Sequence, residues 1–126
     1  MINKHQLREL ITKVLKEMEP LVAYSPAATE MLMMIAAHES RLGTYLRQVR
    51  GPALGIFQIE PATERDIFDN YLMYHEDKRT MVEAYRTSSE VPDMEHNLAY
   101  QIVMARLQLT RKPGELPTKP LPMALY

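Results

Sequence analysis

Prolines divide this sequence into segments of helix length, and no other feature constrains the fold as strongly. A proline blocks the interior of a helix but suits its first turn. Pro20 ends the first segment, whereas Pro26, Pro61 and Pro92 each stand where another segment begins. The spacing therefore predicts a series of separate helices.

Apolar residues repeat with the helical period inside the first two segments. Asn3 and Gln6 resemble a capping box, and the amphipathic stripe that follows consists of Leu7, Leu10, Ile11, Val14, Leu15 and Met18. Ser25 is suited to cap the second helix, which is apolar almost all round over residues 31–37. Because such a helix presents no polar face to water, we expect it in the middle of the fold.

The remaining segments predict three more helices and one irregular stretch. Helices are expected from Pro61, from near Thr80, and from Pro92 or Asp93. Three of the four glycines lie within residues 43–60, where the helical period fails and a loop or small hairpin is expected. A chain of 126 residues suits one domain, so the sequence predicts a single all-α domain of about five helices.

The end of the sequence has a different character. Four prolines within residues 113–126 exclude a helix or a central strand there. We therefore expect a folded domain over residues 1–112 and a Pro-rich extended tail over 113–126, either packed on the domain or loose. The chain has no cysteine, which excludes a disulfide, a cysteine-based zinc site and a thiol nucleophile.

Charge and hydropathy narrow the classes of function. The formal net charge of −1 gives no general attraction to nucleic acid, and the longest apolar stretch, residues 31–37, is too short to span a membrane. Residues 51–95 carry a formal charge of −6 between flanking stretches of +2 and +3. This pattern indicates either solvated helix faces or an acidic wall beside a basic rim that contains Arg41, Arg47 and Arg50.

Motifs for metals, phosphates and serine nucleophiles are missing. His38-Glu39 would need a second histidine at the position of Leu42 to form the HExxH zinc motif, and the other histidines are scattered. Residues 51–55 are not followed by the Lys-Ser/Thr of a phosphate-binding loop, and there is no GxSxG motif. We therefore expect no metal and no cofactor.

Glu39 is the residue best placed for chemistry, because it stands where the apolar helix meets the glycine-containing loop. Burial disfavours the charged form of a carboxyl group, so a buried Glu39 would have a raised pKa and could protonate a leaving-group oxygen. The general acid of glycoside cleavage works in this way. The alternative is a structural glutamate that accepts hydrogen bonds from backbone N–H groups of the loop.

An ordered set of motifs around Glu39 resembles the soluble lytic transglycosylases and the related goose-type lysozymes. The sequence Glu-Ser-Arg-Leu-Gly begins at Glu39, and Gln58 follows nineteen positions later within Gly-Ile-Phe-Gln-Ile-Glu-Pro-Ala-Thr. Residues 97–100, Asn-Leu-Ala-Tyr, resemble the start of the family's later helix. The sequences of residues 37–40 and 51–55 are most similar to those of small proteins encoded by tailed bacteriophages.

The resemblance implies a lysozyme-like fold and cleavage of peptidoglycan between MurNAc and GlcNAc. Glu39 would act as acid and then as base while the sugar's own 6-hydroxyl attacks, which leaves a 1,6-anhydro end and requires no second carboxylate. Ser40 would also support the loop. The residues implied in substrate binding are Ser40, Gly55, Ile56, Gln58 and Tyr100.

Hydrolysis by a goose-type-like lysozyme is one alternative. It would need a second carboxylate that activates water, such as Glu60 or Glu64, if it faces Glu39 across the cleft. Asp66 is a further acidic residue just after the loop. These acidic residues also suit the first turn of a helix, where the helix dipole favours them. The sequence departs from the family in having Gln-Val-Arg at residues 48–50 instead of a small hydroxyl residue. It also lacks the closing Ala-Tyr-Asn-type motif, for which Tyr100 is the candidate substitute.

The partner that the resemblance implies is a peptidoglycan glycan strand, together with phage virion or tail proteins. A rival interpretation is a tail or internal virion protein that keeps the lysozyme-like shape as a structural part, with weak or no activity. No apolar signal-peptide region follows the first residues. We therefore expect synthesis in the host cytoplasm, followed by incorporation into a virion or release to the periplasm.

Overall fold

The computed structural model describes residues 1–111 and 116, and this part of the chain is all-α, as the sequence predicts. Six α-helices and one short 3-10 helix, η1, follow one another without a regular strand among the described residues. Their bounds are α1 (Lys4–Glu17), α2 (Pro26–Ser40), α3 (Pro61–Asn70), η1 (Leu72–Tyr74), α4 (Glu76–Glu83), α5 (Asp93–His96) and α6 (Leu98–Thr110).

Side-chain caps set the beginnings of the first two helices. The Asn3 side-chain oxygen accepts a hydrogen bond from the Gln6 N–H at 3.0 Å. The Ser25 hydroxyl accepts one from the Ala28 N–H at 3.2 Å, and Pro26 occupies the first turn of α2. Each cap satisfies a backbone donor that the helix leaves unpaired, so both predicted starts are confirmed.

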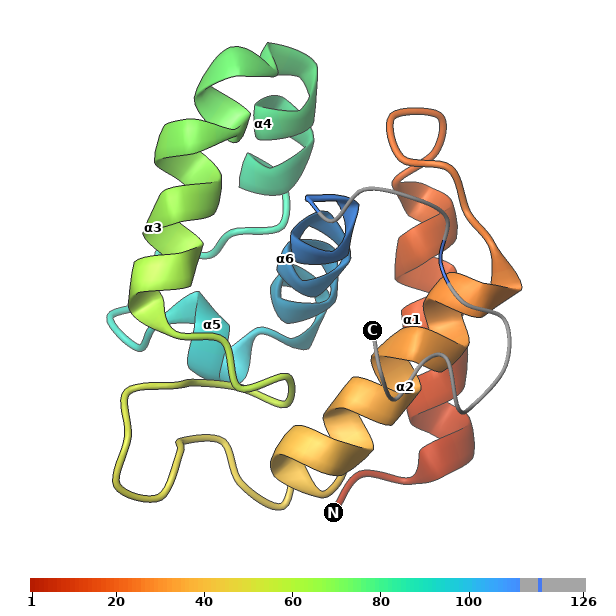
Figure 1. Ribbon diagram of the computed structural model, residues 1–126, viewed down its shortest axis with the longest axis vertical. Coiled ribbons are helices and arrows are strands. Elements are labelled where there is room, and N and C mark those ends of the chain that lie inside the picture. The colour runs from red at the N-terminus through yellow and green to blue at the C-terminus, as the bar shows by residue number, and fades with distance from the viewer. Residues whose placement is uncertain (112–115, 117–126) are drawn as a thin grey trace.

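Helix α6, and not α2, is the central element. It packs against α1, α2, α3, α4 and α5, and Figure 1 shows it between the α3–α4 side and the α1–α2 side of the molecule. In α2, by contrast, Ala37 is exposed and Met34 and Ile35 are only partly buried. The expectation that the helix over residues 31–37 lies in the middle is therefore wrong, because one side of it faces solvent.

Asn97 divides the expected last helix into two. Its backbone is extended, with φ −97° and ψ 95°, and its side-chain oxygen accepts a hydrogen bond from the Tyr100 N–H at 3.1 Å. Asparagine competes with the helical backbone for hydrogen bonds in this way. Helix α5 consequently ends at His96 and α6 begins at Leu98, while α4 begins at Glu76, earlier than the expected start near Thr80.

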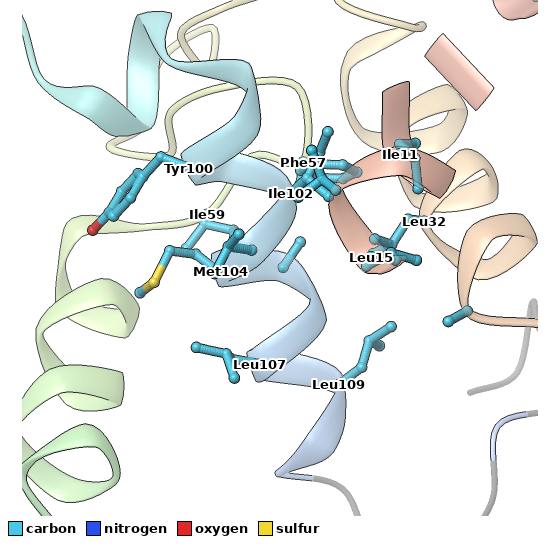
Figure 2. Packing of buried hydrophobic residues seen from close by; sticks show 14 of the residues in the cluster. Ile11, Leu15, Leu32, Phe57, Ile59, Tyr100, Ile102, Met104, Leu107 and Leu109 are labelled. Atoms are coloured by element: carbon cyan, nitrogen blue, oxygen red, sulfur yellow. The ribbon is translucent and has the colours of Figure 1, made fainter. Parts of the chain in front are cut away.

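The 43–60 loop contributes to the core and is fixed by it. Phe57 and Ile59 of the loop belong to one cluster of buried residues with Ile102 and Met104 of α6, and Figure 2 shows these side chains at close range. Burial of a large apolar side chain stabilises a fold by about 1.5–3 kcal/mol. The loop is therefore anchored from inside rather than lying free on the surface.

The predicted tail over residues 113–126 lies outside the described residues except for Leu116, which is partly buried against the core. Among the helices described, none combines the length and the apolar character needed to cross a bilayer.

Candidate active site

The 43–60 loop is held by short stretches of β-pairing. Leu54 forms isolated antiparallel bridges with Arg47 and with Ile59. The Leu54 N–H donates to the Ile59 carbonyl at 3.0 Å, and the Gly55 N–H donates to the Leu46 carbonyl at 2.8 Å. The expected loop or small hairpin thus takes the form of an irregular loop with β-bridges.

Unusual backbone conformations are concentrated in the segment that follows Glu39. Within residues 1–111, the non-glycine residues with positive φ are Arg41, Leu42, Arg50 and Gln58. Left-handed conformations of this kind cost on the order of 1–3 kcal/mol and cluster at functional sites, where the surrounding structure enforces them. All four lie between the end of α2 and the end of the loop, which marks this region as the candidate site.

Ser40 joins the end of α2 to the loop. Its buried hydroxyl donates to the Ile56 carbonyl at 2.6 Å and accepts from the Gly43 N–H at 2.9 Å. It also lies 3.1 Å from the Ala36 carbonyl. Because Glu39 directly precedes Ser40, this hydroxyl fixes the position of Glu39's helix end relative to the Gly55–Gln58 turn.

Gln101 of α6 holds the backbone of the same residue, Ile56, from the other side. Its side-chain oxygen accepts a hydrogen bond from the Ile56 N–H at 2.9 Å, and its side-chain nitrogen lies 3.5 Å from the Asp93 carbonyl. Gly55 allows this approach, since a Cβ there would lie 2.5 Å from the Gln101 oxygen and 2.3 Å from the Met94 carbonyl. Buried side chains from α2 and α6 therefore take up both backbone polar groups of Ile56.

Gln58 is partly buried and turned back on its own loop. Its backbone has φ 51°, and its side-chain nitrogen donates to the Gly55 carbonyl at 2.8 Å. The side-chain oxygen accepts no hydrogen bond from residues 1–111. This arrangement fixes the amide while leaving an acceptor for another molecule.

Glu39 itself is exposed to solvent. The expectation that the apolar helix buries this carboxyl group is therefore wrong, because Glu39 lies on the side of α2 that faces away from the core. The alternative, a glutamate that accepts backbone hydrogen bonds, is also not observed. Glu39 has no hydrogen bond or ion pair with any described residue.

Tyr100 cannot contact a sugar in this structure, which corrects its assignment to substrate binding. Its side chain is completely buried, and its hydroxyl donates a hydrogen bond to the carboxylate of Glu64 on α3. Burial and this hydrogen bond raise the pKa of Tyr100 above the ordinary tyrosine value. Tyr100 is therefore a core residue that joins two helices.

The hydrogen bond from Tyr100 also engages Glu64, which is one of the two candidate second carboxylates. Glu64 is partly buried and held by Tyr100, whereas Glu60 is exposed and caps α3 without a side-chain hydrogen bond. Asp66 pairs with Arg111 and accepts a hydrogen bond from Asn70 at 2.5 Å. Hydrogen bonds from Asn70 and Arg111 lower the pKa of Asp66, so two of the three acidic residues after the loop are engaged elsewhere.

Of the basic rim, Arg47 forms an ion pair with Glu95. Arg41 and Arg50 are exposed and have no ion pair with a described residue. Two cationic side chains on the segment after Glu39 are therefore available to a ligand.

Asp93 and Gln101 are buried polar residues to which the sequence analysis assigns no role in the site. Asp93 accepts hydrogen bonds from the Thr87 hydroxyl at 2.7 Å and from the Asn97 side chain at 3.1 Å. The only local signal for Gln101 is a polar residue inside the apolar stretch of α6. Its partner, Ile56, is far away in the sequence, so no spacing rule could have found it.

Metal-binding groups do not add to this site. One surface depression lies on α1 around Arg8 and Lys13 and another lies over residues 74–80; neither of these is lined by Glu39 or Gln58. No set of three or more acidic or histidine side chains that could hold a metal ion occurs in the described part of the chain. The candidate site thus consists of Glu39 and the loop fixed beside it.

No family model, curated protein or solved structure matches this chain. The resemblance to lytic transglycosylases accordingly rests on the sequence motifs alone.

Proposed function

We propose that this protein cleaves peptidoglycan glycan strands as a lytic transglycosylase, with Glu39 as the single acid and base. The observation that carries the proposal is the 2.6 Å hydrogen bond from Ser40 to the Ile56 carbonyl. It joins the two motifs, Glu-Ser and Gly-Ile-Phe-Gln, whose combination is typical of that family. Beside them, Glu39 is exposed and has no hydrogen bond or ion pair with a described residue.

The proposed reaction proceeds in two proton transfers. Protonated Glu39 gives its proton to the glycosidic oxygen between MurNAc and GlcNAc, and the bond from that oxygen to C1 of MurNAc breaks. The Glu39 carboxylate then takes the proton of the MurNAc 6-hydroxyl, whose oxygen bonds to C1 and closes the 1,6-anhydro ring. Glu39 ends protonated, as it began.

Exposure of Glu39 in the free protein is compatible with this chemistry. A glycan strand over the site would displace water from the carboxyl group, and loss of water favours the neutral form of a carboxyl group. The sequence predicts that the apolar helix shields Glu39 from water; in this proposal the bound substrate would do so.

A single-carboxylate mechanism is favoured over hydrolysis by the engagement of Glu64. A water-activating base must reach the attacking water, and one oxygen of the Glu64 carboxylate is held by the Tyr100 hydroxyl, which orients the group toward α6. Of the two proposed second carboxylates this leaves Glu60, whose side chain makes no hydrogen bond or ion pair with a described residue. The motif resemblance extends the proposal to a phage-encoded protein that reaches the wall from a virion or after release to the periplasm.

Product analysis tests the proposal. The purified chain is incubated with purified peptidoglycan, and the released muropeptides are identified by mass spectrometry. We expect products with 1,6-anhydro ends. Reducing ends would contradict the transglycosylase mechanism in favour of hydrolysis, and retained binding without any product would contradict enzymatic function and favour a structural virion protein.

A further inference from the structure

We propose that Gln101 is a positioning residue that holds the Gly55–Gln58 turn in place beside Glu39. The inference rests on the proposed function for its catalytic consequence, but not for its structural basis. Gln101 lies on α6, is completely buried, and accepts the Ile56 N–H at 2.9 Å. It would touch neither the glycan nor the reacting atoms.

The geometry leaves the backbone of Ile56 little freedom. Its carbonyl is held by Ser40 of α2 and its N–H by Gln101 of α6. The two side chains come from different helices, so the Ile56 backbone links the helix that carries Glu39 to the central helix of the fold. No buried side-chain polar atom in the described residues lacks a hydrogen-bond partner.

Gln58 depends on the Gly55–Ile56 peptide unit, which contains both the Gly55 carbonyl and the Ile56 N–H. The Gln58 N–H and the Gln58 side-chain nitrogen both donate to the Gly55 carbonyl, at 3.1 and 2.8 Å. The Gly55 carbonyl carbon is in turn bonded to the nitrogen of Ile56, the atom that Gln101 holds. A shift of the Ile56 N–H away from Gln101 therefore moves the acceptor that orients Gln58.

The Gln101 side chain is itself held by a second contact, on its nitrogen. Its side-chain nitrogen lies 3.5 Å from the Asp93 carbonyl at the start of α5. Asp93 is nearly buried and held by Thr87 and Asn97. A packed polar cluster thus orients the Gln101 amide. Such support is required where reacting groups must be held within a fraction of an ångström of their productive positions.

The direct test replaces Gln101 with methionine, which has a similar size but no oxygen acceptor. Gln108→Met is the matched control, since Gln108 lies on the same helix and is exposed. Backbone hydrogen exchange of the full-length chain is followed residue by residue. We expect exchange at Ile56 to become about 5- to 100-fold faster in Gln101→Met, as loss of one buried hydrogen bond predicts, with little change in the α1 core.

A second variant perturbs the same turn from the loop side. Gly55→Ala leaves the α6 sequence unchanged and displaces the turn, because the new Cβ would lie 2.3 Å from the Met94 carbonyl and 2.5 Å from the Gln101 oxygen, at a backbone position with φ 79°. Gly51→Ala is its control, because the nearest atoms to a Cβ there belong to the end of the flexible Gln48 side chain. Faster exchange at Ile56 is expected in Gly55→Ala and not in Gly51→Ala.

The catalytic consequence is read separately, on peptidoglycan. Gln101→Met is expected to lower kcat by about 100-fold, as a small misplacement in a reacting geometry does, while KM changes much less. A wild-type chain without activity would overturn the proposed function but leave the exchange test intact. Unchanged exchange at Ile56 in Gln101→Met, or faster exchange with kcat preserved in an active enzyme, would overturn the positioning role.

Discussion

The hydroxyl of Tyr100 donates a hydrogen bond to the carboxylate of Glu64, and this contact joins the central helix α6 to α3. Arg86 lies over the Tyr100 ring, 5.5 Å from its centroid, and over the Phe68 ring at 5.3 Å. Tyr100 is therefore a core residue that joins two helices, and its side chain is not accessible to a sugar.

Tyr100→Phe is expected to lower the free energy of unfolding by about 1–3 kcal/mol, because it removes a hydrogen bond to a charged group. Urea unfolding measures the change. Tyr74→Phe is the control, since Tyr74 is 74% exposed, and we expect it to stay within about 0.5 kcal/mol of wild type. Tyr100→Phe should keep its activity on peptidoglycan wherever it is folded. A folded but inactive variant would show that Tyr100 takes part in the reaction.

Ser40→Ala is expected to destabilise the fold by about 1–3 kcal/mol, because it leaves the Gly43 N–H and the Ile56 carbonyl without their partner. The measurement is denaturant unfolding, and Ser88→Ala at an exposed position serves for comparison. Equal stability of the two variants would mean that the Ser40 hydroxyl does not support the loop.

Asp93 makes stability depend on acid pH. Burial alone would raise its pKa, but hydrogen bonds from Thr87 and Asn97, together with the charge of Arg86 at 3.6 Å, outweigh burial and lower the pKa of Asp93. Because the folded-state pKa lies below the unfolded value of about 3.9, the stabilisation is present above that pH. It is lost as pH falls toward the folded-state value.

Asp93→Asn should therefore flatten the fall in unfolding free energy below about pH 4. It should also destabilise the protein at neutral pH by about 1–3 kcal/mol, since an amide cannot accept all these donors. Unfolding is measured across the acid range, with the exposed Asp69→Asn as control. A wild-type acid slope retained in Asp93→Asn would assign the effect to other carboxylates.

The helices were predictable where the signal is local. Asn3 and Ser25 cap through hydrogen bonds to residues three positions ahead, and such contacts depend only on neighbouring sequence. The break at Asn97 was less visible, because Pro92 and Asp93 also suit a helix start. The central position of α6 depends on its packing against five other helices. The apolar content of a helix alone does not predict which helix lies at the centre.

The site shows the same division. The motif spacing from Glu39 to Gln58 anticipated which segments meet. It did not predict the exposure of Glu39, because helix apolarity does not say which side of α2 faces the core. Gln101 was missed because the contact on which its proposed role depends joins it to Ile56, a residue distant in the sequence.

Replacement of Glu39 by glutamine tests the central claim most directly. Glutamine keeps the shape of the side chain but cannot donate or accept the proton, and general acid–base catalysis contributes about 10²- to 10⁴-fold to a rate. The rate of muropeptide release is compared among wild type, Glu39→Gln and Glu90→Gln, the last at an exposed position outside the site. We predict a loss in that range for Glu39→Gln alone, with unchanged unfolding, whereas release at the wild-type rate by Glu39→Gln would contradict the account.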